Sequence, residues 1–147
     1  MRRTLVVGCG NPLRQDDGLG WTAAAQLSDE NTNPLVKIIT CEQLNPELAT
    51  EMSEADRVII VDASTIGHAG QVKVEKVMPN NSPTRTMSHE LQLATLLTYA
   101  GELYHSSPET FIITVSGESF GYGDQLTPAV SGALKKTLQT IQTLVNE

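Results

Sequence analysis

Short apolar runs alternate along this chain with longer segments whose apolar residues recur at helical spacing. The apolar runs predict strands at residues 4–7, 36–40, 57–61 and 111–115. Helical spacing predicts helices from Asp17 to about Ser28, Asn45 to Ala55, Ser88 to Tyr104, and Pro128 to about Val145. The segment from Gln71 to Val77 instead alternates apolar and charged residues, which predicts a strand with one exposed face at the edge of a sheet.

Strands that alternate with helices favour a mainly parallel sheet covered on both faces. We therefore expect one α/β domain over residues 1–147, with three layers and a twisted five-stranded sheet whose edge strand, 71–77, is antiparallel. Right-handed crossovers place the loops after the four parallel strands at the same end of that sheet. If the first strand lies between the second and third, Asp17 and Asp62 come together there, where open sheets of this type bind ligands.

Composition and charge narrow the class of protein. The 147 residues are 39% hydrophobic and 18% charged, as in an ordinary globular protein, and the formal net charge is −7. An acidic chain is a poor partner for nucleic acid or an anionic membrane, and no apolar run approaches the ~20 residues that span a bilayer. The two cysteines, Cys9 and Cys41, form no CxxC motif, so we expect reduced thiols in the cytoplasm.

A glycine-rich loop, residues 8–20, follows the first strand. Its Gly8-Cys9-Gly10 start is typical of a nucleotide-binding loop, but Leu13 stands where a third glycine is expected, and no Walker lysine follows. A nucleotide-binding α/β domain is therefore kept only as an alternative. Cys9 is either a reactive thiol or a small residue that packs a tight turn. Ser116 is not in a nucleophile-elbow motif.

Acidic residues and one histidine stand at the ends of predicted elements. Asp16 and Asp17 open the first helix, where one of them would suffice as a cap, and Asp62 ends the buried third strand. His89 begins a helix, where an imidazole has no obvious capping value. Together Asp17, Asp62 and His89 offer oxygen and nitrogen ligands suited to a divalent ion such as nickel, zinc or iron. The topology alone brings Asp17 to Asp62 and leaves the reach of His89 open.

The ordered motifs of this chain resemble those of the endopeptidases that mature nickel–iron hydrogenases. The resemblance runs almost end to end and rests on the following segments: Gly8-x-Gly10-Asn11-x-Leu13-x-x-Asp16-Asp17-Gly18-x-Gly20, Gln43–Leu48, Val61–Ala63, Ser88–Leu91, Gly117–Gly121 and Leu126–Val130. It implies a peptidase that removes the C-terminal extension of a hydrogenase large-subunit precursor after nickel insertion. The family's metal-contacting residues fall on Asp17, Asp62 and His89, and many relatives carry glutamate at the first of these positions.

This resemblance also implies where the metal comes from. The nickel is supplied by the substrate, so we expect no tightly held metal of the protein's own, and no HExxH motif occurs. Water activated by Asp17 or Asp62, with or without nickel as Lewis acid, is the leading hypothesis for catalysis, and His89 could orient a group or carry a proton. Asp16 is expected to be structural. We expect a cytoplasmic monomer. A nickel-sensing module without peptidase activity is the other alternative.

Overall fold

The computed structural model describes residues 2–79 and 89–147, and the side chains of all of these except 89–92. Within these residues five strands form one sheet: β1 (Thr4–Cys9), β2 (Val36–Cys41), β3 (Arg57–Ser64), β4 (Val72–Val77) and β5 (Glu109–Ser116). The helices of the same residues are the 3-10 helix η1 (Gln15–Gly18) and the α-helices α1 (Leu19–Glu30), α2 (Leu48–Ser53), α3 (His89–Tyr104) and α4 (Pro128–Asn146).

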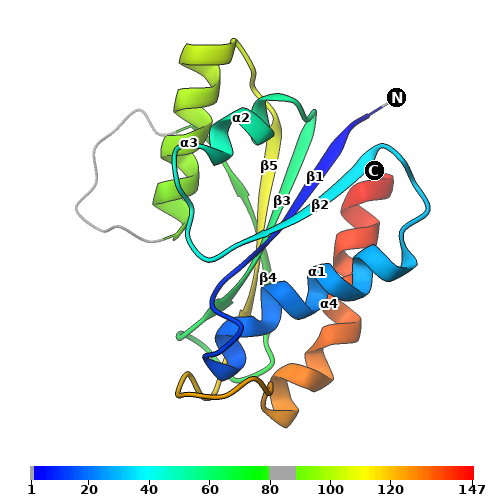
Figure 1. The fold of residues 1–147 in the computed structure, drawn as a ribbon, viewed down its shortest axis with the longest axis vertical. Coiled ribbons are helices and arrows are strands. Elements are labelled where there is room, and N and C mark those ends of the chain that lie inside the picture. Colours follow the sequence, from blue (N-terminus) through cyan, green and yellow to red (C-terminus); the bar gives the residue numbers. More distant parts are fainter. Residues whose placement is uncertain (1, 80–88) are drawn as a thin grey trace.

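The strand order is β2-β1-β3-β5-β4, so the first strand lies between the second and the third, as the proposed meeting of Asp17 and Asp62 requires. β1 runs parallel to β2 and β3, and β3 runs parallel to β5. β4 is antiparallel to β5 and forms one edge of the sheet, which confirms the prediction made from its alternating pattern. The carboxyl ends of the four parallel strands therefore lie at the same edge of the sheet (Figure 1).

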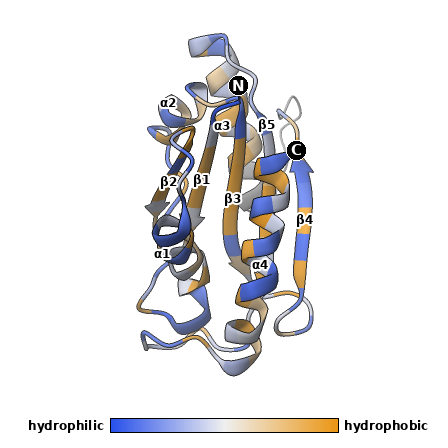
Figure 2. Ribbon diagram, turned by 90° about the vertical axis from the view of Figure 1, so that its right-hand side faces the viewer, coloured by the Kyte–Doolittle hydropathy of each residue, from blue (hydrophilic) through white to orange (hydrophobic). Residues whose placement is uncertain are grey.

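Apolar cores lie on both faces of the sheet because alternate residues of each strand point to opposite sides. In β1, Leu5 and Val7 pack with α2 and α3 on one face, whereas Val6 packs with α1 and α4 on the other. All three side chains are at most 2% exposed, and each contributes roughly 1.5–3 kcal/mol by its burial. Figure 2 shows the same contrast by colour: the central strands β1 and β3 are largely apolar, whereas β4 is largely polar.

Two predicted helix starts are wrong. α1 begins after Gly18, with no side-chain hydrogen bond at its cap, because both neighbouring aspartates bind other groups. α2 begins at Leu48 rather than at Asn45, and it ends before Ala55. The Asn45 Oδ1 accepts the N–H of Glu47 at 3.1 Å and closes a turn ahead of the helix, as asparagine readily does.

No helix in the described part of the chain combines the length and the apolar composition needed to cross a bilayer.

Candidate active site

A cleft of about 700 Å³ opens at the carboxyl edge of the sheet, on the face that α2 and α3 cover. Both Asp17 and Asp62 line it, one from the glycine-rich loop after β1 and the other from the end of β3. The rest of the lining comes from the β3–β4 loop, β4, β5 and the two glycine-rich loops: Arg14, Ala63, Ser64, Thr65, Ile66, Gly67, Gln71, Lys73, Glu75, Ile112, Thr114, Ser116 and Phe120. The predicted carboxylate pair thus shares one open cleft.

The backbone of the glycine-rich loop holds Asp17 in this position. Gly10 has φ +130°, and a Cβ atom there would lie 2.0 Å from the Asp17 carbonyl oxygen, so only glycine fits. The next N–H, of Asn11, donates to Asp17 Oδ2 at 2.9 Å, and the N–H of Gly10 donates to the Cys41 carbonyl at 3.1 Å. Because these N–H groups already have acceptors within the protein, the loop is not built as a phosphate cradle.

Asp16 turns away from the cleft and is completely buried. Its Oδ2 accepts the backbone N–H groups of Glu118 at 2.7 Å and Ser119 at 3.0 Å. Its Oδ1 accepts the N–H of Thr127 at 2.8 Å, and the Thr127 hydroxyl donates to Oδ2 at 2.8 Å. Burial alone would raise the pKa of Asp16, but these hydrogen bonds favour the carboxylate and bring the pKa below its ordinary value. Asp16 therefore fastens the second glycine-rich loop and the start of α4 to the first loop.

β3 continues to Ser64, so Asp62 lies two residues before the end of the strand instead of ending it as predicted. Asp62 is only 1% exposed, although it lines the cleft. Its Oδ1 accepts the N–H of Ala63 at 2.9 Å, which fixes the carboxylate at the strand end. Because Gly8 of β1 lies opposite Val61 of β3, Asp62 comes level with Cys9. The end of β3 thus places a buried carboxylate at the wall of the cleft.

His89 is the first residue of α3, and its side chain lies outside the described residues. α3 runs in the direction opposite to β5, so the helix begins on the side of the sheet where the parallel strands end (Figure 1). Among the residues whose side chains the structure describes, no three His, Cys, Asp or Glu side chains form a group that could hold a metal ion. The other two histidines, His68 and His105, are exposed.

Two sulfur atoms lie next to the carboxylates. Cys9 Sγ and Cys41 Sγ are 3.0 Å apart and are not joined by a disulfide. The hydrogen bond to Cys41, burial, and the negative charges of Asp62 and Asp17 all raise the pKa of the Cys9 thiol. A thiol held in its protonated form is a poor nucleophile, so the structure favours packing over catalysis for Cys9. Ser116 donates its hydroxyl proton to the Ile66 carbonyl at 2.6 Å and holds the β3–β4 loop.

Several cleft residues were not identified from the sequence. Arg14 belongs to the glycine-rich loop, and its Nε donates to the Phe120 carbonyl at 3.1 Å. Lys73 and Glu75 form an ion pair of 2.7 Å on β4. The alternating pattern of 71–77 could have predicted that Lys73 and Glu75 lie side by side, because residues two apart on a strand share a face.

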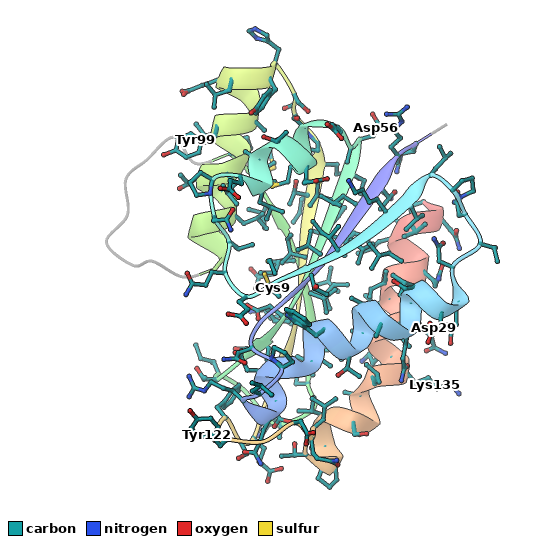
Figure 3. All side chains as sticks on the ribbon, viewed as in Figure 1. Cys9, Asp29, Asp56, Tyr99, Tyr122 and Lys135 are labelled. Carbon is teal, nitrogen blue, oxygen red and sulfur yellow. The ribbon has the colours of Figure 1, made fainter. Side chains whose placement is uncertain are left out.

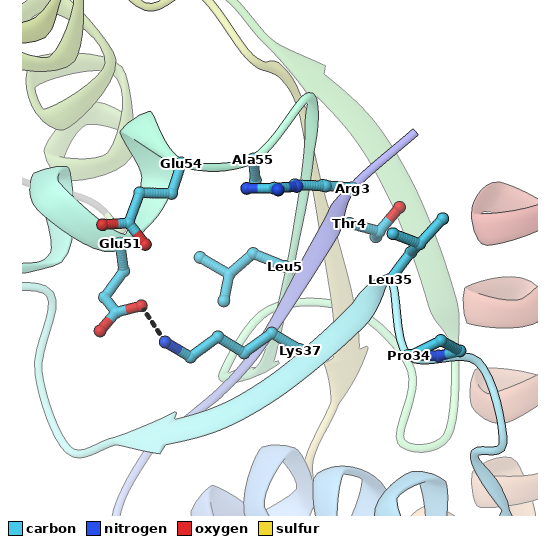
Figure 4. A pocket seen from close by; sticks show the side chains of 9 residues that line it. All are labelled: Arg3, Thr4, Leu5, Pro34, Leu35, Lys37, Glu51, Glu54 and Ala55. Atoms are coloured by element: carbon cyan, nitrogen blue, oxygen red, sulfur yellow. Dashed lines mark hydrogen bonds and ion pairs between the residues drawn. The ribbon is translucent and has the colours of Figure 1, made fainter. Parts of the chain in front are cut away.

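A second hollow, of about 260 Å³, lies at the opposite end of the sheet, beside the start of β1 (Figure 4). An exposed ion pair between Lys37 and Glu51, 2.7 Å long, crosses part of it. Neither Asp17 nor Asp62 lines this hollow, and two of its charged residues, Lys37 and Glu51, pair with each other at the surface. The cleft at the carboxyl edge is therefore the candidate active site.

Comparison with known proteins assigns the chain to a family. The sequence model of the family described as "Hydrogenase maturation protease" matches residues 23–144. The chain belongs to the hydrogenase maturation protease family. It is therefore a peptidase, a hydrolase of peptide bonds.

Individual relatives support the assignment. The solved hydrogenase maturating endopeptidase HybD of Escherichia coli has a TM-score of 0.82 at 25% identity, over 98% of this chain and 92% of that one. A [NiFe] hydrogenase maturation protease, HycI, of Thermococcus kodakarensis has the same fold at 20% identity, with a TM-score of 0.77 over 99% and 94% of the two chains. A Methanocaldococcus jannaschii protein called "Putative hydrogenase maturation protease MJ0253" is 27% identical over 146 residues, which cover 93% of this chain and 92% of that one.

Proposed function

We propose that this peptidase removes the C-terminal extension of a nickel–iron hydrogenase large-subunit precursor and recognises nickel already bound to that precursor. The observation that carries the proposal is the placement of Asp17 and Asp62, from two different strands, in one open cleft at the carboxyl edge of the sheet. Membership of the hydrogenase maturation protease family supports the substrate class. The metal is part of the substrate, so the protein needs no resident ion.

In this proposal Asp17, Asp62 and His89 are the protein's contacts to the nickel. Carboxylate oxygens and an imidazole nitrogen complement the thiolates that hold nickel in the precursor, and such mixed ligand sets suit a borderline divalent ion. Asp62 supports this role because it is buried at a fixed strand end and yet lines the cleft. Asp17 supports it because the loop backbone holds one of its oxygens and leaves the residue half-buried at the cleft wall.

The same carboxylates can serve the hydrolysis itself. One of them accepts a proton from water, the hydroxide attacks the carbonyl carbon of the scissile peptide, and the leaving amine takes up a proton. Nickel bound to the precursor would position that peptide and could polarise its carbonyl. A precursor without nickel would then be cleaved slowly, because its scissile peptide is not held in the cleft.

Exposed apolar side chains on the loops at this edge support a large protein substrate. Leu13 is 60% exposed, Ile66 is 80% exposed and Tyr122 is 97% exposed. Ile66 lines the cleft itself, and the N–H of Gly123, next to Tyr122, donates to the Leu13 carbonyl at 3.0 Å, so those two loops are joined. Tyr122 extends from its loop into the solvent in Figure 3. Side chains of this kind often anchor protein partners. We take the working form to be a cytoplasmic monomer.

The test is to incubate a nickel-loaded large-subunit precursor with the wild-type protein and with Asp17→Ala, Asp62→Ala and His89→Ala variants. The mass of the precursor is followed, and circular dichroism checks the fold of each variant. We expect the wild type to shorten the precursor at its C-terminus and all three folded variants to lose that activity. If the wild type binds the precursor without shortening it, the protein is a nickel-sensing module. Unchanged cleavage by the Asp62→Ala variant would contradict the proposed role of the cleft.

A further inference from the structure

Cys9 and Cys41 are the last residues of the neighbouring parallel strands β1 and β2, and the register places them directly opposite each other. Their side chains lie on the same face of the sheet, with the two Sγ atoms 3.0 Å apart. Figure 3 shows Cys9 inside the molecule, close to the end of β2. The proposed catalytic scheme uses neither thiol, so this cysteine pair beside the candidate active site has no assigned role.

The backbone geometry of this pair already suits a covalent bond. Neighbouring strands lie about 4.7–4.9 Å apart, and disulfides bridge Cα atoms that are about 4.4–6.8 Å apart. The Sγ atoms need to approach each other by only about 1 Å to reach the length of an S–S bond. The strand ends are held in place as well, because the Cys41 carbonyl accepts the N–H of Gly10 at 3.1 Å.

We propose that Cys9 and Cys41 are a site of reversible oxidation, at which a small-molecule disulfide converts the two thiols into a disulfide between β1 and β2. This inference does not depend on which precursor the peptidase cleaves. The pair borders the carboxylate cleft, since Cys9 lies level with Asp62 in the sheet.

The order of the steps follows from exposure. Cys41 is partly exposed, whereas Cys9 is only 1% exposed, so the oxidant meets Cys41 first. The Cys41 thiolate attacks one sulfur of oxidised glutathione, forms a mixed disulfide and releases one glutathione thiolate. The mixed disulfide removes the hydrogen bond between the two thiols, which is the main reason why Cys9 stays protonated in the reduced protein. Cys9 then loses its proton to solvent and attacks Cys41 Sγ, which expels the second glutathione thiolate. The protein loses two electrons and two protons, and one oxidised glutathione becomes two reduced ones.

The structure also supplies an optical reporter. Trp21, the single tryptophan of the chain, donates its indole N–H to the Cys41 carbonyl at 3.2 Å. A covalent change at Cys41 therefore takes place beside the indole, and we expect oxidation to change the tryptophan fluorescence. Reduction with dithiothreitol should restore the original signal.

The experiment treats the folded, reduced full-length protein with oxidised glutathione and measures its intact mass, its reactive thiols and its fluorescence. We expect the wild type to lose the mass of two hydrogen atoms and both reactive thiols, and a peptide map to link residues 9 and 41. A Cys9→Ser variant should instead retain one glutathione on Cys41, because the second step is removed.

Two results would overturn the inference. One is a wild-type protein that keeps both thiols reduced after treatment with oxidised glutathione, while an unfolded sample of it reacts. The other is a wild-type protein that accumulates the same glutathione adduct as Cys9→Ser and forms no internal bond. The wild-type measurement needs no substitution, so it is valid even if the serine variant fails to fold.

Discussion

Replacing Asp16 by asparagine tests whether the two glycine-rich loops depend on this one buried carboxylate. Asparagine has nearly the same shape, so the change leaves no cavity, but it replaces one acceptor oxygen by an NH2 group that only donates. With the amide oxygen in the place of Oδ2, the bonds from Glu118, Ser119 and the Thr127 hydroxyl remain possible. The backbone N–H of Thr127 then faces the NH2 group and loses its acceptor.

The magnitude follows from these bonds. A buried donor left without a partner costs about 1–3 kcal/mol, and the remaining bonds lose the strengthening that a charged acceptor gives. We expect Asp16→Asn to lower the free energy of unfolding by about 2–4 kcal/mol, a large part of the total stability of a domain of this size. With a urea slope of about 2 kcal/mol per M, the unfolding midpoint falls by about 1–2 M.

The assay is urea unfolding, monitored by the fluorescence of Trp21, and Asp17→Asn is the matched control. Asp17 is only half-buried, and its neighbouring N–H donor at Asn11 could still bond to an amide oxygen, so the control should lose less than about 1 kcal/mol. If Asp16→Asn unfolds at the same urea concentration as the wild type, the carboxylate does not fasten the two loops.

The dependence on pH gives a second check of the same idea. The pKa of Asp16 is lower in the folded protein than its ordinary value of 3.8, so its carboxylate stabilises the fold above that value. This contribution is lost as the pH falls through the lowered pKa of the folded state. The difference in free energy of unfolding between the wild type and Asp16→Asn should therefore shrink in strong acid. A difference that stays constant from neutral pH to strong acid would contradict the proposed role of the Asp16 carboxylate.

Three further changes test the fold and the exposed apolar side chains that we propose contact the precursor. Gly20→Ala should lower the free energy of unfolding by about 2–4 kcal/mol, because the added Cβ would lie 2.5 Å from the Val61 carbonyl oxygen. Thermal unfolding measures this, and an unfolding midpoint equal to that of the wild type would show that α1 can move aside. Glu109→Gln weakens the ion pair with the buried Arg57 and should cost about 1 kcal/mol at neutral pH, a small value because the Glu109 side chain is 38% exposed. Arg57 lowers the pKa of Glu109 below its ordinary 4.5, so the ion pair stabilises the wild type above pH 4.5 and is lost as the pH falls through the lowered pKa. A difference in unfolding midpoint between the wild type and Glu109→Gln that persists in strong acid would contradict this. Tyr122→Ser should raise the precursor concentration for half-maximal cleavage by about tenfold, or about 1.4 kcal/mol, without changing the fold. An unaltered concentration would show that Tyr122 does not contact the precursor.

The sequence predicted the sheet well because strand signals are local. Continuous apolar residues marked the buried β1 and β3, and alternation marked the edge strand β4. Asp62 could be placed because it directly follows such a run, and the strand order then brought it level with the loop after β1. The position of the carboxylate pair in the cleft was therefore predictable, whereas its chemical role stays a prediction.

Other features depended on contacts that the sequence pattern does not contain. Asp16 looked like a helix cap, but its bonds go to residues more than a hundred positions away, and only the folded loops create them. The start of α2 was misplaced because an asparagine before a proline closes a turn as readily as it caps a helix. The pairing of Cys9 with Cys41 needed the register of two strands, which neither strand specifies alone.

The central claim is that the cleft around Asp17 and Asp62 acts on a precursor that already carries nickel. The most direct measurement is the intact mass of the large-subunit precursor after incubation with this peptidase, with and without nickel in the same precursor preparation. We predict that the nickel-loaded precursor loses its C-terminal peptide while the nickel-free one keeps it. Equal cleavage of the two precursors would contradict the claim.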